Sequence, residues 1–149
     1  MTLHPGFYNS KVNEFTYDRN PESFAYIPEG QGKHYFMGGF NGGKAKNYFE
    51  LVHCLDDSIK KDLEKNVIAL WHDESHLNRY MLDLDETKYR ILNPSYAYPE
   101  DWDLPFDEKI TILNKNKMGG HDFLRKNKKS SFLKKCINLL AKLSNGEIK

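Results

Sequence analysis

Cysteine is scarce in this chain, and long apolar runs are missing from it. The 149 residues include two cysteines, Cys54 and Cys136, which are far apart and fit no metal-ligand spacing. They make no disulfide framework, so a reducing compartment is expected. No apolar run approaches the roughly 20 residues of a membrane span, and the N-terminus lacks the charged and apolar regions of a signal peptide. These absences predict a soluble, cytoplasmic chain.

The charge is balanced overall but unevenly distributed. With 39% hydrophobic and 29% charged residues, the composition is that of a globular domain. Residues 1–110 carry 12 basic and 19 acidic side chains, a net charge of −7, whereas residues 111–149 carry 10 and 2, a net charge of +8. Such a basic segment indicates either an anionic partner (a nucleotide diphosphate, nucleic acid or a membrane surface) or a solvated basic helix. Because aromatics do not alternate with its lysines, nucleic acid is the least favoured.

Hydrophobic periodicity alternates along the chain between the helical and the extended pattern. Short apolar runs predict strands over residues 34–37, 67–70, 89–92 and 109–113. Helical spacing predicts a helix over residues 44–64, a second one with Asp73 as its N-cap, and a third with an apolar face over 132–143. This alternation predicts an α/β layer architecture. The last helix lies in a basic amphipathic tail over residues 126–149.

Residues 71–78, Trp-His-Asp-Glu-Ser-His-Leu-Asn, are the segment richest in functional groups. They follow an expected strand and open an expected helix, and the carboxyl ends of strands are where α/β proteins bind ligands. His72 and His76 are four residues apart, but the His-Glu-x-x-His order of a zinc protease is absent. A helix capping box would place Glu or Gln at His76. The segment therefore indicates a functional site.

Together with four other stretches, this run resembles glycosyltransferase family 6, the family of the ABO histo-blood-group and α-1,3-galactosyl transferases. The other stretches are Leu3-His4-Pro5-Gly6-Phe7-Tyr8, Phe15-Thr16-Tyr17, Ala25-Tyr26-Ile27-Pro28, and Met37-Gly38-Gly39-Phe40 with Gly42-Gly43. The resemblance implies a GT-A-like α/β fold, with residues 1–125 as the C-terminal half of the catalytic domain. It also implies retaining transfer of galactose or N-acetylgalactosamine from the UDP-sugar to the 3-OH of a galactoside, expected to be fucosylated.

The resemblance assigns a role to each matching site residue. Glu74 is implied as the catalytic carboxylate, which stabilises or traps the positive charge on the anomeric carbon as UDP leaves. The residues implied to bind the donor sugar are Met37, Gly38, Gly39, His72 and Asp73. Those implied on the acceptor side are His4, Thr16, Trp71 and Tyr98, and those on the UDP diphosphate are Lys117 and Arg125. Gly39 leaves space for an N-acetyl group, which favours N-acetylgalactosamine, whereas Met37 is associated with galactose transfer.

The chain departs from the family pattern in three places. Gly119 falls where the family's diphosphate lysine belongs, unless a short insertion brings Lys117 there. The Glu-Tyr-x-Trp-Asp pattern that helps hold the acceptor in the animal enzymes is Ser95-Tyr96-Ala97-Tyr98-Pro99 here, so Glu100 or Asp101 would substitute for its aspartate. This resembles the bacterial branch. The family's first half, with the uridine pocket and the Asp-x-Asp metal motif, has no counterpart before Met1. We therefore expect no metal ligand in this chain, and Mn²⁺ only where a separate N-terminal half supplies Asp-x-Asp.

Three interpretations of this shortened pattern stay open. The expectation is a truncated gene product, a split gene or a misplaced start, carrying the ancestral glycosyl transfer. The alternatives are an inactive remnant and a carbohydrate-binding or assembly module that pairs with a separately encoded N-terminal half. The basic tail further predicts peripheral contact with anionic membrane at its inner face.

Overall fold

Two compact units make up the chain, which divides between Ile112 and Leu113. The structure, a computed structural model, describes residues 1–120. In the second unit the described element is a short 3₁₀ helix, η4, over Lys115–Met118. The expected tail over 126–149, with its helix over 132–143, lies outside the described residues, as do Arg125 and Cys136.

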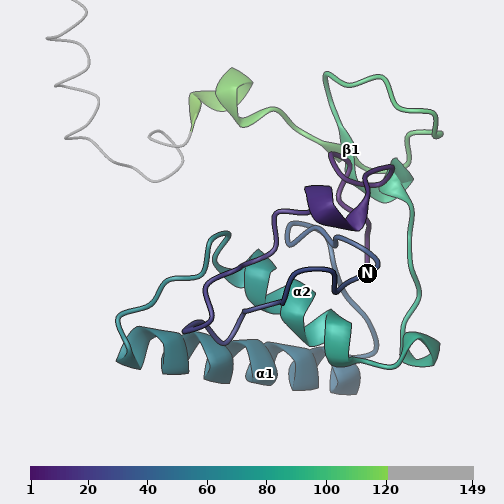
Figure 1. The fold of residues 1–149 in the computed structure, drawn as a ribbon. Coiled ribbons are helices and arrows are strands. Elements are labelled where there is room, and N and C mark those ends of the chain that lie inside the picture. The colour runs from purple at the N-terminus through teal and green to yellow at the C-terminus, as the bar shows by residue number, and fades with distance from the viewer. Residues whose placement is uncertain (121–149) are drawn as a thin grey trace, which may run out of the picture. The chain divides into compact units, whose positions relative to one another are not determined.

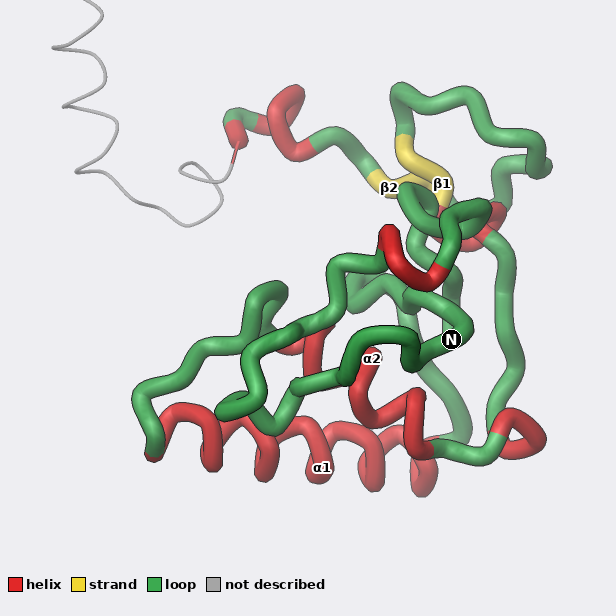
Figure 2. The backbone as a smooth tube through the Cα atoms, in the orientation of Figure 1, coloured by secondary structure: helices red, strands yellow, loops and turns green. Residues whose placement is uncertain are grey.

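The first unit is built around two α-helices. Helix α1 spans Ala45–Glu64, and α2 spans Asp73–Asp83 and packs against it (Figure 1). Loops supply most of the remaining chain, as Figure 2 shows in green, with three short 3₁₀ helices among them: η1 (Val12–Glu14), η2 (Glu86–Lys88) and η3 (Pro94–Ala97). No helix within residues 1–120 combines the length and the apolar character needed to cross a bilayer.

Helix α1 confirms the periodicity over residues 44–64. Its apolar positions return at helical spacing, and Leu51 is buried among Phe36, Leu77 and Met81. The helix ends at Glu64 with Lys65 as its C-cap, and Asn66 follows in a left-handed conformation with φ of 57°. Asparagine tolerates this conformation better than most residues, and a left-handed residue just past the last turn is a common helix stop. The chain then turns back toward α2.

The predicted strands are wrong for residues 34–37, 67–70 and 89–92. The first makes one antiparallel bridge (Leu3↔Phe36) and the last one parallel bridge (Thr2↔Leu92). Residues 67–70 have no strand partner, because the Leu70 N–H donates instead to the Asp18 carboxylate at 2.8 Å. In this segment two residues are buried and two, Ile68 and Leu70, are exposed. These segments are extended but form no strand ladder. Instead each makes a single bridge to one residue or a hydrogen bond to a side chain.

The one sheet within residues 1–120 is a parallel pair of two-residue strands. Strand β1 (Tyr98–Pro99) pairs with β2 (Thr111–Ile112) in the register Tyr98↔Thr111 and Pro99↔Ile112. Strand β2 falls inside the predicted strand over residues 109–113. The described chain is thus a small mixed helix and strand structure, consistent with part of an α/β domain.

Two apolar clusters form the core on either side of residues 35–36. The first is largely aromatic and contains Phe15, Tyr17, Ile27 and Tyr35. The second contains Phe36, Leu51, Leu77 and Met81. Because successive side chains of an extended segment point in opposite directions, Tyr35 enters the first cluster and Phe36 the second. This segment therefore joins the loops of the N-terminal region to the two helices.

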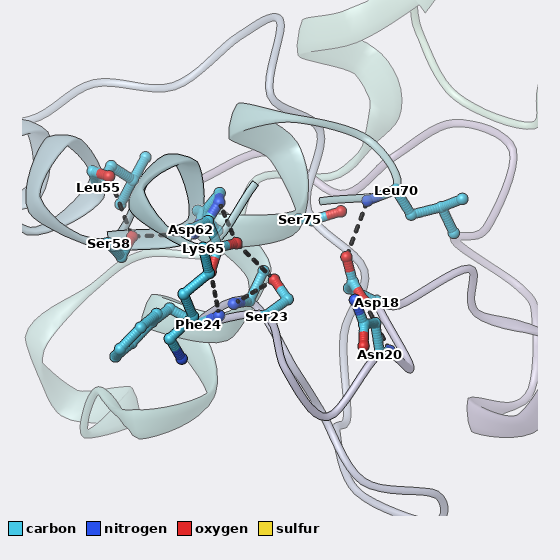
Figure 3. A network of polar contacts seen from close by, with 12 residues as sticks. Asp18, Asn20, Ser23, Phe24, Leu55, Ser58, Asp62, Lys65, Leu70 and Ser75 are labelled. Carbon is cyan, nitrogen blue, oxygen red and sulfur yellow. Dashed lines mark hydrogen bonds and ion pairs between the residues drawn. The ribbon is translucent and has the colours of Figure 1, made fainter. Parts of the chain in front are cut away.

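A buried polar network fixes the helices to each other and to the loop before them (Figure 3). The Asp62 carboxylate of α1 accepts hydrogen bonds from the Ser23 hydroxyl at 2.6 Å and the Phe24 N–H at 2.7 Å. His76 of α2 contacts Asp62 through Nε2 at 3.4 Å and the Ser58 hydroxyl through Nδ1 at 2.9 Å. Each buried side chain of this network has a hydrogen-bond or ion-pair partner, which offsets the cost of removing it from water.

Candidate active site

The start of α2 is a strained turn that presents three polar residues. The helix begins at Asp73 and not after it, so the predicted N-cap at Asp73 is wrong by one residue and His72 is the cap. His72 has φ of 52° and ψ of −126°, a sparsely populated conformation for a residue with a side chain. The Ser75 hydroxyl accepts the Trp71 N–H at 2.9 Å and holds the turn closed. Such strain is concentrated at functional sites.

Glu74, in the first turn of α2, points its carboxylate into a cradle of two donors. Oε1 accepts a hydrogen bond from the Tyr35 hydroxyl at 3.1 Å, and Oε2 accepts one from the Gly38 N–H at 2.8 Å. The carboxylate is half-buried. A carboxylate with both oxygens held in one orientation can stabilise positive charge that develops beside it.

Gly38 makes this cradle because it has no side chain. A Cβ at this position would lie 3.1 Å from Glu74 Cβ and 3.4 Å from Glu74 Oε2. The Asn41 side chain donates to the Gly38 carbonyl at 2.7 Å and keeps the glycine turn folded back. The predicted donor-sugar residue Gly38 and the predicted catalytic residue Glu74 are therefore in direct contact.

Asn78 joins the segment carrying Gly38 to the helix carrying Glu74. Its side-chain oxygen accepts the Phe36 N–H at 2.8 Å, and its amide donates to the Phe36 carbonyl at 2.9 Å. The same amide also donates to the Glu74 carbonyl at 2.9 Å. Buried Asn78 thus replaces the neighbouring strand that residues 34–37 lack.

His4 lies beside this cradle with one ring nitrogen already used. Its Nδ1 accepts the Gly6 N–H at 3.0 Å, and its ring meets the edge of the Tyr35 ring at 5.7 Å between centroids. Burial lowers the pKa of His4, and the negative charge of Glu74 opposes this in part. The imidazole is therefore neutral at pH 7, with its proton on Nε2, where it can donate to a ligand.

The rim of the site is formed by exposed residues and two hollows. Trp71, His72 and Asp73 are all exposed, Trp71 at 50%. A cavity of about 330 Å³ is bordered by Gly38, Asp73 and apolar residues of α1. A second cavity, of about 240 Å³, has His72 and Asp73 at its edge. Asp73, the residue before Glu74, thus lines both cavities, and Glu74 itself lines neither.

Met37 and Gly39, the pair predicted to select the donor sugar, lie close together. A Cβ at exposed Gly39 would lie 2.9 Å from the Met37 methyl carbon Cε. The free space at Gly39 is thus bounded by the flexible end of Met37, so the two positions share one volume.

The acceptor-side predictions fall into two groups. Thr16 lies close to the cradle, since its hydroxyl donates to the Tyr35 hydroxyl at 3.2 Å. Tyr98 is buried, and its hydroxyl accepts the Leu104 N–H at 2.8 Å and donates to the Leu104 carbonyl at 3.3 Å. Tyr98 therefore closes its own loop, and its contact with an acceptor stays a prediction.

The two residues predicted to bind the diphosphate lie outside the described part of the first unit. Lys117 belongs to the second unit, in η4, and Arg125 lies outside the described residues. Within residues 1–120, no group of three or more His, Cys, Asp or Glu side chains is arranged to hold a metal ion. The diphosphate contacts and the metal expectation stay predictions.

Sequence reasoning gave no role to three residues in or near the site: Tyr35, Asn78 and Trp102. Tyr35 contacts Glu74 although it stands in what the pattern presents as an ordinary strand. Asn78 was included in the functional run without a role, and Trp102 was passed over in favour of its acidic neighbours. Trp102 is 49% exposed, and its ring lies 3.8 Å from where a Cβ at Gly6 would be. The presence of a polar or aromatic residue within an apolar segment was the available signal.

Comparison with known proteins agrees with this geometry. A family model described as glycosyltransferase family 6 matches residues 1–125. The chain is 44% identical over 99 residues to histo-blood group ABO system transferase 2 of Rattus norvegicus, covering 66% of this chain and 29% of that protein. It is 36% identical over 98 residues to globoside alpha-1,3-N-acetylgalactosaminyltransferase 1 of Gallus gallus, covering 66% and 28%. It is 30% identical over 124 residues to O-antigen biosynthesis glycosyltransferase WbnI of Escherichia coli, covering 83% and 52%.

The chain belongs to glycosyltransferase family 6, and the resemblance inferred from its motifs is confirmed. It spans between about a quarter and a half of the length of these relatives. The segments that build the cradle, residues 3–17, 35–41 and 71–78, all fall within the family match.

Proposed function

We propose that this chain carries the catalytic and acceptor-side residues of a retaining hexosyltransferase. The reaction is transfer of N-acetylgalactosamine or galactose from its UDP-sugar to the 3-OH of a terminal galactose, fucosylated in the natural acceptor. The observation that carries the proposal is the Glu74 carboxylate, held at both oxygens by Tyr35 and Gly38. Gly38 and Asp73, its neighbours in the site, border a cavity of about 330 Å³.

The chemistry needs a fixed negative charge on one face of the sugar. The bond between the anomeric carbon and the UDP oxygen breaks, and a bond to the acceptor oxygen forms on the same face. UDP and the proton of the acceptor hydroxyl leave. In between, the anomeric carbon is cation-like, and a carboxylate on the opposite face lowers the energy of that state. Glu74 has the charge and the fixed orientation for this role.

The acceptor side of the proposal rests on groups around His4. Neutral His4 offers Nε2–H to a sugar hydroxyl, since its Nδ1 is occupied by Gly6. Exposed Trp71 offers a flat apolar surface for a sugar ring, and Trp102 offers a second one beyond Gly6. Aromatic faces suit the C–H surfaces of galactose, which supports a galactoside as the acceptor class.

The donor side of the proposal rests on the glycine turn and on Asp73. The space at Gly39, limited by Met37, supports N-acetylgalactosamine as a donor sugar. One relative's name, that of the Gallus gallus enzyme, also refers to N-acetylgalactosaminyl transfer. In this proposal the sugar hydroxyls bind to Asp73, which is exposed and lines both cavities, and to His72, which is exposed and lines one of them.

For the complete enzyme we propose a GT-A-like domain whose nucleotide-binding part is supplied by sequence outside this chain. The matches cover 29% and 52% of these relatives, which leaves room for such a part. Lys117 and Arg125 would bind the UDP diphosphate, and Mn²⁺ would enter only with an Asp-x-Asp segment from that part.

Replacement of Glu74 by Gln, in a complete enzyme that joins this chain to a nucleotide-binding part, tests the function. The change keeps the size of the side chain and removes its charge, so turnover is expected to fall by roughly 10²–10⁴-fold. Glu50→Gln, at an exposed position of α1, is the matched control and should leave turnover unchanged. Sugar transfer from each UDP-sugar to a fucosylated galactoside is the measurement. A Glu74→Gln enzyme within about a factor of two of the parent would rule out the assigned role.

The same assay separates the alternative function. A parent chain that binds the galactoside by calorimetry but transfers no sugar from either donor would support a carbohydrate-binding module. In that case Trp71→Ala should abolish binding and Glu74→Gln should leave it intact. Binding would then depend on the stacking surface of Trp71 and not on the charge of Glu74.

A further inference from the structure

The Tyr35 hydroxyl lies between two polar groups to which the resemblance gives different roles: Glu74 as the catalytic carboxylate and Thr16 on the acceptor side. It is 3.1 Å from Glu74 Oε1 and 3.2 Å from the Thr16 hydroxyl oxygen. The side chain is 2% exposed. A tyrosine hydroxyl offers one proton and accepts at its oxygen, so the two contacts have defined directions.

The direction of these hydrogen bonds runs toward Glu74. The Thr16 hydroxyl donates to the Tyr35 oxygen, which leaves the Tyr35 proton for another acceptor. Glu74 Oε1 at 3.1 Å is nearer than the Thr16 carbonyl at 3.5 Å, and it carries the charge. Burial raises the pKa of the Tyr35 hydroxyl well above its usual range, so the proton stays on the phenol oxygen. Tyr35 is therefore a permanent donor to the carboxylate.

The ring of Tyr35 is held firmly enough to fix this donor in space. It stacks on the Tyr17 ring at 5.4 Å between centroids and at 25° between planes. Phe7 lies at 4.6 Å and Phe15 at 5.8 Å, each tilted against it. Rings packed on several sides cannot swing, so the hydroxyl keeps its distance to Glu74 while ligands enter and leave. A preorganised donor of this kind needs no rearrangement during the reaction.

We propose that Tyr35 is the positioning residue of this site, which locks one oxygen of Glu74 while the Gly38 N–H locks the other. This inference rests on the proposed function for Glu74. With both oxygens fixed, the plane of the carboxylate is defined, and its charge faces one point in space. Tyr35 acts on the reaction through Glu74 and does not touch the sugar.

The test replaces Tyr35 by Phe, which removes the hydroxyl and keeps the packed ring. Tyr17→Phe is the matched control. Tyr17 is also buried and stacks on Tyr35, but its hydroxyl donates to the His34 carbonyl at 2.7 Å and not to Glu74. Each variant therefore loses a phenol that donates one hydrogen bond, and only Tyr35→Phe loses a donor to the carboxylate. Tyr35→Phe also loses the hydrogen bond that the Thr16 hydroxyl donates.

The first readout needs no turnover. Carbon-13 label in the glutamate carboxyl groups gives Glu74 its own NMR signal, which is identified by its loss in Glu74→Gln. At constant pH this signal is expected to move in Tyr35→Phe, because the carboxylate loses a hydrogen-bond donor. In Tyr17→Phe it should not move. A Glu74 signal that stays unchanged in Tyr35→Phe overturns the inference.

The second readout is the division between kcat and KM. Loss of a donor to the reacting carboxylate should lower kcat by about 10- to 100-fold with little change in KM. In the Glu74→Gln background, Tyr35→Phe should have no further effect. A full effect in that background, or a loss confined to KM, overturns the inference. If Glu74→Gln itself leaves turnover intact, the proposed function fails instead.

A variant that fails to fold does not end the test. In the unmutated chain, carbon-13 label at the tyrosine Cζ atoms reports each phenol. One tyrosine signal, that of the phenol bonded to Glu74, is expected to move in Glu74→Gln at constant pH. If no tyrosine signal moves in Glu74→Gln, the inference is overturned.

Discussion

At the scale of single residues, the two glycines of the turn have different roles although they are adjacent. Gly38 allows its backbone to reach the Glu74 side chain, where a Cβ would lie 3.1 Å from Glu74 Cβ. Gly39 faces away from Glu74 and meets only the flexible end of Met37. A methyl group at position 38 would push against a helix, and one at position 39 against a movable thioether. Substitutions at these positions should therefore affect catalysis and donor choice separately.

Gly39→Ala is expected to shift donor preference from UDP-N-acetylgalactosamine toward UDP-galactose. The new methyl would lie 2.9 Å from Met37 Cε, so both groups compete for the volume that the N-acetyl group needs. One methyl in a tight pocket changes discrimination by about 10- to 200-fold. Competition between the two donors measures the ratio of kcat/KM. Gly42→Ala, where a Cβ would meet nothing within 4 Å, is the control, and an unchanged ratio in Gly39→Ala removes this position from the donor site.

His72 shows how a strained residue can hide in a sequence. Its φ of 52° is forced by the turn that connects the extended residues 67–70 to α2. Nothing in the residue type announces this, because glycine or asparagine would suit the conformation better. The strain costs of order 1–3 kcal/mol, and it sets the direction in which the chain passes from Trp71 into the helix at Asp73.

At the scale of elements, the two α-helices are joined through a buried imidazole. His76 of α2 lies between Asp62 and Ser58 of α1, with its side chain 3% exposed. Burial lowers the pKa of His76, while the negative charges of Asp62, Asp18 and Asp73 oppose the change. The folded chain therefore binds the His76 proton less readily than the unfolded chain does.

This arrangement predicts a loss of stability in mild acid. Above about pH 6.5 the imidazole is neutral in both states, and its contribution to stability is fully present. As the pH falls from there toward the lowered pKa of folded His76, the unfolded state takes up the proton first, and the free energy of unfolding decreases by at most about 1.4 kcal/mol per pH unit. His4, whose pKa burial also lowers, acts in the same direction.

Urea unfolding at several pH values between 7.5 and 5 checks this prediction. His76→Gln removes the titrating group and should make the free energy of unfolding less dependent on pH. His53→Gln, at an exposed position of α1, is the control and should keep the parent's slope. If His76→Gln and the parent lose stability equally between pH 6.5 and 5, His76 does not couple the helices to pH.

At the scale of the whole molecule, the uneven charge is the main feature that the described structure leaves unused. The basic residues gather in 111–149, most of which lies outside the described residues. The proposal of peripheral contact with an anionic membrane therefore rests on sequence: an apolar stripe over 132–143 flanked by lysines. Each lysine near an anionic surface contributes about 1 kcal/mol, and the apolar stripe would insert between headgroups.

Vesicle co-sedimentation tests this proposal on the intact chain. Binding is expected to vesicles that contain phosphatidylserine and to weaken at high salt, because salt screens the attraction. Lys134→Glu with Lys135→Glu should lower binding to these vesicles, whereas Lys60→Glu with Lys61→Glu on α1 should have little effect. Equal binding to neutral and anionic vesicles would contradict the membrane proposal.

The family and the identity of most proposed site residues were readable from sequence, because short segments with unusual density of functional groups keep their order along the chain. The run over 71–78 and the glycine turn over 37–43 are such segments. Helix α1 was also readable, since its apolar side repeats at helical spacing over twenty residues. The expected strands were not, because a short apolar run has the same composition whether it pairs with a strand or with a side chain.

What the sequence by itself determined is therefore local: the amphipathic helix, the glycines, the charge distribution and the set of groups at the start of α2. Only the tertiary structure decided what those groups meet. Leu70 bonds to the Asp18 carboxylate, Phe36 to the Asn78 amide, and Glu74 to Tyr35 and Gly38, across separations of more than thirty residues. Hydrogen bonds between residues so far apart depend on how the chain folds back on itself. The spacing of residues along the sequence does not indicate which distant residues will meet.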